Sequence, residues 1–158
     1  MINKNLKISI LGLGYVGLPL AIGFSKKYKV VGYDINNSRI RELRNGIDRT
    51  KEIKNKNDLK NKNLIFSSKS SCMASSDFYI ITVPTPITKK NQPDLSIIKE
   101  AAITVAKVIN KKAIVILEST VYPGVTENFL IPIIENSSGL EYKKDFFVAY
   151  SPERINPG

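Results

Sequence analysis

The residue types that are scarce in this chain exclude several kinds of chemistry. Its 158 residues contain no histidine, so a mechanism that depends on an imidazole within this chain is excluded. The single cysteine, Cys72, cannot form an internal disulfide, which agrees with a reducing compartment. No apolar run approaches the roughly 20 residues of a membrane helix, and no secretory signal pattern is present. We therefore expect a cytoplasmic protein with no membrane partner.

The composition is that of an ordinary globular domain with a strong positive charge. Hydrophobic residues make up 42% and charged residues 24% of the chain, and the length predicts one domain over residues 1–158. The net charge of +10 invites a nucleic-acid interpretation. Much of this charge lies between residues 51 and 63, where Lys alternates with Asn, and no zinc-finger spacing or aromatic-studded basic groove accompanies it. We interpret the stretch as solvated surface and expect no nucleic-acid partner.

Apolar runs and helical patterns alternate along the chain. Strands are expected at 7–11, 29–34, 64–66, 77–83, 113–117 and 146–150, and helices at 15–25, from Asn36 or Asn37 to Gly46, from Asp94 to Ile109, and from Pro123 to Ile134, where Pro132 should cause a kink. The strands are uniformly apolar, as expected when both faces of a sheet are covered. The pattern predicts a Rossmann-type, doubly wound α/β fold with about six mainly parallel strands and helices on both faces.

The sharpest motif is Gly12-Leu13-Gly14-Tyr15-Val16-Gly17, between the first strand and the first helix. In a dinucleotide fingerprint, Gly12 allows the tight turn, Gly14 lets the backbone approach a diphosphate, and Gly17 lets the helix pack closely. The helix start then offers free N–H groups to the phosphates.

A second strand ends in an acid, Asp34, seventeen residues after Gly17. A carboxylate there accepts hydrogen bonds from the adenosine ribose and repels a 2′-phosphate, so NAD is favoured over NADP. Arg39 lies five residues further on and keeps that choice open.

Three further segments follow predicted strands and should line the same crevice. They are Val83-Pro84-Thr85-Pro86, Glu118-Ser119-Thr120-Val121 and Ser151-Pro152-Glu153-Arg154. In open α/β sheets, ligands lie at the carboxyl ends of the strands. Each segment alone is equally compatible with a simple turn of Pro, Ser and Thr, and their shared location favours a functional role for the set.

Together these segments resemble the UDP-glucose/GDP-mannose dehydrogenase family. The resemblance is carried, in the family's order, by Gly12 to Pro19, Val83 to Pro86, Glu118 to Gly124, and Ser151 to Gly158. The form Glu-Arg-Ile-Asn-Pro-Gly at 153–158 is similar to the branch that acts on UDP-N-acetylhexosamines. The branch that acts on UDP-glucose usually has Pro-Glu-Phe-Leu there.

The resemblance implies oxidation of the sugar C6 alcohol to a carboxylate, with two NAD per turnover and no metal. Such enzymes make uronic acids for capsule and other surface polysaccharides. A cysteine thiolate captures the aldehyde, and the thioester is then hydrolysed. By position, Thr120 and Glu153 would hold the water and assist acid–base steps. The segment Glu153, Arg154, Ile155 and Asn156 would contact the UDP-sugar. Thr85 and Thr120 would approach the nicotinamide half of NAD, with Val83, Pro84 and Ser119 beside them.

The chain departs from the family in its length. Family members have three parts, and the resemblance covers only the first, so the nucleophilic cysteine and most of the UDP pocket are expected elsewhere. Cys72 lies before the fourth predicted strand and is expected to pack as a small hydrophobe. We therefore expect this chain to bind NAD without oxidising sugar alone, and the full-length enzyme to be a homo-oligomer.

Two alternatives remain open. One is a free-standing NAD-binding module without catalysis. The other is a Rossmann dehydrogenase of β-hydroxyacid type, although such enzymes usually carry a different segment at the position of Glu118 to Gly124.

Overall fold

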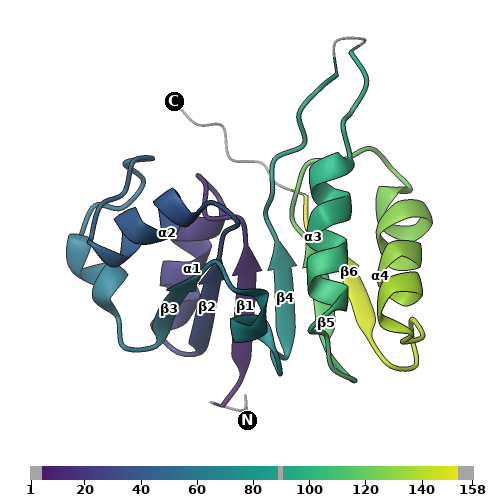
Figure 1. Cartoon of the computed structure of the whole chain (residues 1–158), viewed down its shortest axis with the longest axis horizontal. Coiled ribbons are helices and arrows are strands. Elements are labelled where there is room, and N and C mark those ends of the chain that lie inside the picture. The colour runs from purple at the N-terminus through teal and green to yellow at the C-terminus, as the bar shows by residue number, and fades with distance from the viewer. Residues whose placement is uncertain (1–4, 89–90, 153–158) are drawn as a thin grey trace.

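The computed structural model describes residues 5–88 and 91–152. Six parallel strands form one sheet in the order β3-β2-β1-β4-β5-β6, as Figure 1 shows. The strands are β1 (Lys7–Leu11), β2 (Lys29–Tyr33), β3 (Leu64–Ser67), β4 (Phe78–Ile81), β5 (Ile114–Leu117) and β6 (Phe147–Tyr150). The predicted Rossmann-type sheet is confirmed.

Helices connect the strands and divide between the two halves of the sheet (Figure 1). They are α1 (Gly17–Ser25), α2 (Asn37–Arg44), the short 3-10 helices η1 (Lys56–Lys60) and η2 (Ser70–Met73), α3 (Ser96–Ala106), the π-helix η3 (Thr126–Leu130) and α4 (Ile131–Ser138). No helix in the described part of the chain is long and apolar enough to cross a bilayer.

The strands are apolar on both faces because each face packs against its own set of helices. On β4, Tyr79 and Ile81 join the cluster built with α3 and α4, whereas Ile80 joins the cluster built with α1 and α2. The two edge strands depart from the expected burial: Ile65 on β3 is 58% exposed, and Phe147 and Tyr150 on β6 are 41% and 42% exposed.

Two helix predictions need correction at their ends. Asp94 accepts a hydrogen bond from the Ser96 amide (2.9 Å), but the helix boundary is at Leu95, and Ile109 lies beyond the last residue of α3. In place of one kinked helix, the π-helix η3 is followed by α4, with Pro132 in the first turn of α4. A proline in a first turn removes an N–H that has no helical partner there, so α4 tolerates it.

The order of the strands fixes where a ligand can bind. The chain leaves β1 toward β2 on one side and β4 toward β5 on the other, so the neighbours β1 and β4 form the topological switch point. The carboxyl ends of these two strands open into the crevice that dinucleotides use in this fold.

Candidate dinucleotide-binding site

The glycine turn after β1 requires glycine at its first position. Gly12 has φ +95°, a conformation that L side chains rarely adopt, and a Cβ there would lie 3.0 Å from the Thr82 carbonyl oxygen. Its amide donates to the Tyr33 carbonyl at 2.9 Å, which joins the turn to the end of β2. The turn is therefore held between the strands on either side of β1.

Gly17 and Gly14 serve different purposes. A Cβ at Gly17 would overlap the Gly12 carbonyl oxygen and the Thr82 hydroxyl, so the start of α1 packs directly on the turn. A Cβ at Gly14 would meet no atom of the described residues within 4 Å. The protein itself leaves space at Gly14, and a diphosphate is the group for which this fold usually keeps such space.

The N-terminus of α1 is open to an anion. Val16 precedes the helix, no side chain of residues 5–88 or 91–152 caps it, and no acidic residue lies in its first turn. The amide groups and the positive end of the helix dipole therefore remain available to a phosphate.

Asp34 lies against the glycine turn. Its Oδ2 accepts a hydrogen bond from the Leu13 amide at 2.9 Å, and its Oδ1 accepts one from the Asn36 amide at 2.9 Å. An ionised carboxylate has about four acceptor positions, so both oxygens can still accept from a ribose. Asp34 and the glycine turn, which the sequence motif predicted to act together, therefore lie side by side.

A cavity of about 430 Å³ continues from Asp34. One wall comes from the ends of β1 and β2 and from the loop after β4, and the other comes from α3. The lining residues are Leu11, Gly12, Tyr33, Asp34, Ile35, Val83 and Pro84, together with Ser96, Ile97, Glu100, Ala101 and Thr104. Its size lies within the range of small-molecule sites.

Sequence reasoning missed the wall that α3 contributes. Ile97, Glu100, Ala101 and Thr104 recur at helical spacing and form one stripe beside the buried face of the helix. The signal was present in the periodicity, but a mixed stripe of Ile, Glu, Ala and Thr looks like an ordinary boundary between core and surface.

The loops after β4 and β5 are joined to each other by side chains. The Thr85 hydroxyl donates to the Thr120 carbonyl oxygen at 2.7 Å, and the Ser119 hydroxyl donates to the Val83 carbonyl oxygen at 2.6 Å. The structure thus brings together two of the three predicted crevice segments. Ser119 is buried, so its hydroxyl braces the crevice wall.

The third segment begins at the same edge. Ser151 follows β6, and its amide donates to the carbonyl oxygen of Leu117, the last residue of β5, at 2.9 Å. Ser151 therefore lies beside the carboxyl end of β5. Glu153, Arg154, Ile155 and Asn156 lie outside the described residues.

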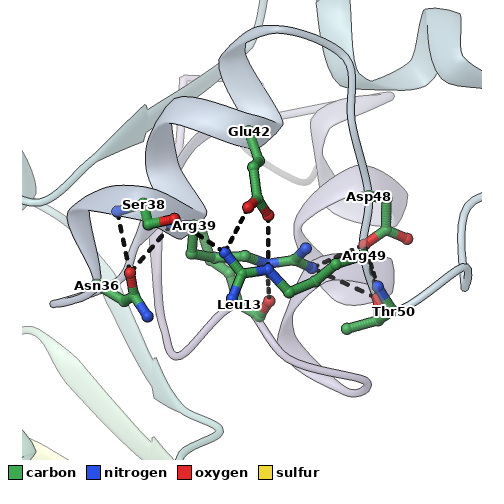
Figure 2. Close-up of polar contacts among 8 residues, drawn as sticks. All are labelled: Leu13, Asn36, Ser38, Arg39, Glu42, Asp48, Arg49 and Thr50. Atoms are coloured by element: carbon green, nitrogen blue, oxygen red, sulfur yellow. Dashed lines mark hydrogen bonds and ion pairs between the residues drawn. The ribbon is translucent and has the colours of Figure 1, made fainter.

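Arg39 is buried beneath the glycine turn (Figure 2). Its Nε donates to the Leu13 carbonyl oxygen at 2.9 Å, and its Nη2 donates to Asp48 Oδ1 at 2.8 Å. Nη1 is buried and has no hydrogen-bond partner among the described residues. The guanidinium therefore supports the turn, with one nitrogen, Nη1, and its two N–H groups left unpaired among the described residues.

Asp48, which the sequence did not single out, is the counter-charge of Arg39. Burial alone would raise the pKa of Asp48, but hydrogen bonds from Thr50 and Arg39 outweigh burial and lower it. Only the local Asp-x-Thr pattern indicated a hydrogen-bonded turn, because Asp48 pairs with Arg39 only in the folded chain.

Cys72 is half-buried near the end of β3, and its Sγ accepts a hydrogen bond from the Ser67 hydroxyl at 3.2 Å. It packs against the apolar cluster that includes α3. This environment agrees with the expected packing role.

Residues 6–158 match the NAD binding domain of the UDP-glucose/GDP-mannose dehydrogenase family. The chain belongs to this family. Its relatives include protein CapL of Staphylococcus aureus, 55% identical over 154 residues, and the UDP-N-acetyl-D-glucosamine 6-dehydrogenase of Pseudomonas aeruginosa, 50% identical over 155 residues. Each match covers 98% of this chain but only 36% and 37% of those proteins.

Solved structures of family members have the same architecture. The UDP-D-ManNAc dehydrogenase of Pyrococcus horikoshii superposes with a TM-score of 0.90 at 40% identity, covering 97% of this chain and 37% of that one. A lactate dehydrogenase from Eimeria maxima, at 20% identity and a TM-score of 0.56 over 89% of this chain and 42% of that one, shares the fold alone.

Proposed function

We propose that this NAD-binding domain serves a longer UDP-N-acetylhexosamine 6-dehydrogenase. The observation that carries the proposal is the contact of Asp34 with the Leu13 amide, because it sets a ribose-binding acid beside a phosphate-binding turn at the switch point. Bound NAD would supply the acceptor for the hydride that leaves the sugar C6.

The described residues fit NAD at each part of the cofactor. The open space at Gly14 and the uncapped start of α1, at Tyr15, Val16 and Gly17, suit the diphosphate. Asp34, whose two carboxylate oxygens can each still accept a hydrogen bond, suits the adenosine ribose. The cavity between Ile35, Val83, Pro84 and α3 suits the adenine, whose flat faces favour apolar neighbours.

The reacting end would lie over the braced loops. We assign Thr85, Ser119 and Thr120 to the nicotinamide side, because these residues follow β4 and β5 and hold each other in place. Thr120 and Glu153 would hold a water and assist proton transfer, and Glu153, Arg154, Ile155 and Asn156 would contact the sugar nucleotide. These assignments to the sugar rest on the family resemblance.

The names of the relatives support the substrate class. Two are described as acting on UDP-N-acetyl-D-glucosamine and UDP-N-acetyl-D-mannosamine, and CapL carries a capsule-type name. We therefore propose that the whole protein makes a UDP-N-acetylhexosaminuronate for a surface polysaccharide, as a cytoplasmic homo-oligomer.

Calorimetry of the 158-residue chain with NAD, NADP and UDP-GlcNAc tests the proposal. We expect NAD binding, weaker NADP binding, and little or no binding of the sugar nucleotide, whose pocket would come mostly from other parts of the protein. Tight binding of UDP-GlcNAc without NAD binding would contradict it.

Asp34→Ala provides the sharper test. It removes an acceptor for ribose hydroxyls and leaves the Leu13 amide without its partner, so NAD affinity should fall by about 2 kcal/mol, roughly thirtyfold. The exposed Glu52→Ala is the matched loss of one carboxylate and should bind NAD as wild type does. Unchanged affinity in Asp34→Ala would mean that the ribose contact is wrongly assigned.

A further inference from the structure

Two arginines lie close to the acid of the proposed ribose site. Arg39 is in the first turn of α2, and Arg49 reaches back to that turn, where its Nη2 donates to the Ser38 hydroxyl at 3.1 Å. The pKa of Arg49 is raised mainly by its hydrogen bonds to Glu42 and, more weakly, by the charge of Asp34. In this fold an arginine near the ribose acid is what accommodates the 2′-phosphate of NADP.

Both arginines are already paired with acids. Arg39 Nη2 contacts Asp48 Oδ1 at 2.8 Å, and the two side chains are 5% and 6% exposed. Arg49 donates from Nε and Nη2 to the two oxygens of Glu42, each at 2.6 Å (Figure 2). With Asp34, three carboxylates and two guanidinium groups lie in this region, so these five groups together carry a net charge of −1.

The pairing of Arg39 also fixes its direction. Asp48 is itself held by the amide and hydroxyl of Thr50, at 3.1 and 2.7 Å, and by the amide of Ile53 at 3.2 Å. This anchored carboxylate holds Nη2 on the side of residues 48–53 while Nε remains on the Leu13 carbonyl. A guanidinium bound at two of its nitrogens cannot turn its planar fork toward a phosphate.

We propose that Asp48, assisted by Glu42, is a positioning residue that sets the preference of this site for NAD over NADP. It acts by committing Arg39 to the glycine turn and by cancelling the positive charge that a 2′-phosphate would need. The proposal rests on the proposed NAD site and adds to it two acids that do not touch the cofactor.

The test is the ratio of the dissociation constants for NADPH and NADH, measured by the change in nicotinamide fluorescence. In Asp48→Asn, whose amide oxygen can still accept from Thr50, the ratio should fall about tenfold, roughly the effect of one new charge-assisted hydrogen bond to phosphate. A merely structural loss would weaken both cofactors equally and leave the ratio unchanged. An unchanged ratio in Asp48→Asn that still binds NADH would overturn the proposal.

Glu42→Gln tests the effect of the second acid on the same ratio without disturbing the interior, because the pair of Glu42 with Arg49 is at the surface. The ratio should fall about threefold, in keeping with a more screened charge. If Asp48→Asn does not fold, this variant decides, and an unchanged ratio in it counts against the proposal. Glu52→Gln, the loss of one exposed carboxylate from the same loop, is the matched control and should keep the wild-type ratio.

A double variant shows whether Asp48 acts through Arg39. In an Arg39→Met background, Asp48→Asn should change the ratio by much less than tenfold, because no guanidinium remains to be released and only the loss of one negative charge acts. A full tenfold shift in that background would assign the effect to simple charge and reject the positioning role. Failure of the wild-type chain to bind NADH at all would instead reject the proposed function, so the two failures are distinguishable.

Discussion

At the scale of single residues, Gly14 and Gly17 should respond differently to one added methyl group. Gly17→Ala places a Cβ against the Gly12 carbonyl and the Thr82 hydroxyl and should lower the free energy of unfolding by about 2 kcal/mol. The methyl group of Gly14→Ala would contact none of the residues that the structure describes, so this change should alter the free energy of unfolding by less than about 0.5 kcal/mol. Yet Gly14→Ala should weaken NAD binding about tenfold or more, because the methyl group would occupy the space of the diphosphate.

Urea unfolding and NAD calorimetry on the same preparations measure both effects. Wild-type NAD affinity in Gly14→Ala would contradict the placement of the diphosphate. This pair could be chosen from the sequence because the fingerprint is local, with every spacing inside one turn. Asp48 could not be chosen from the sequence, because its role depends on an ion pair with Arg39, which itself contacts Leu13 only in the folded chain.

At the scale of elements, the sequence predicted every strand and main helix, but their ends depend on neighbours. The expected strand 77–83 is paired only over β4, and of its last two residues Val83 lines the cavity whereas Thr82 faces the glycine turn. The Thr82 amide still donates to the Leu11 carbonyl of β1 at 2.9 Å, while its hydroxyl lies 2.9 and 2.8 Å from the carbonyl oxygens of Leu11 and Gly12, so the end of this strand also supports the glycine turn. Apolar content alone does not distinguish these two uses.

The start of α2 allows a matched test of a cap. The sequence left Asn36 and Asn37 as alternatives, and the structure selects Asn36, whose Oδ1 accepts from the amides of Ser38 and Arg39 at 2.9 and 3.1 Å. Asn36→Ala should therefore lower the free energy of unfolding by about 1 kcal/mol. Asn37→Ala loses only an exposed bond from Ser68 and should cost less than about 0.5 kcal/mol. Urea unfolding compares the two, and a larger loss in Asn37→Ala would contradict the assigned cap.

At the scale of the whole molecule, acid should destabilise the fold for two reasons that add. Hydrogen bonds from Arg49, Ser96 and Lys111 lower the pKa values of Glu42, Asp94 and Asp145, respectively. At Asp48, burial acts to raise the pKa, but the hydrogen bonds from Thr50 and Arg39 have the larger combined effect, so the pKa is lowered overall. A carboxyl whose folded pKa is depressed stabilises the fold fully above its unfolded pKa of about 4, and that contribution is lost as the pH falls through the folded pKa.

The second reason is the net charge of +10, which grows as the carboxylates are protonated and increases repulsion across the folded surface. We therefore expect the free energy of unfolding to be nearly level between pH 7 and 5 and to fall steeply below about pH 4.

Asp48→Asn removes one of the groups that titrate there, so its curve of unfolding free energy against pH should start lower at pH 7 and fall less steeply. Added salt should recover part of the loss below pH 4 because it screens the surface repulsion, but it should not restore the buried Arg39–Asp48 pair. Urea unfolding at each pH and at two salt concentrations separates the two contributions, and an Asp48→Asn curve parallel to the wild type would remove Asp48 from the acid response.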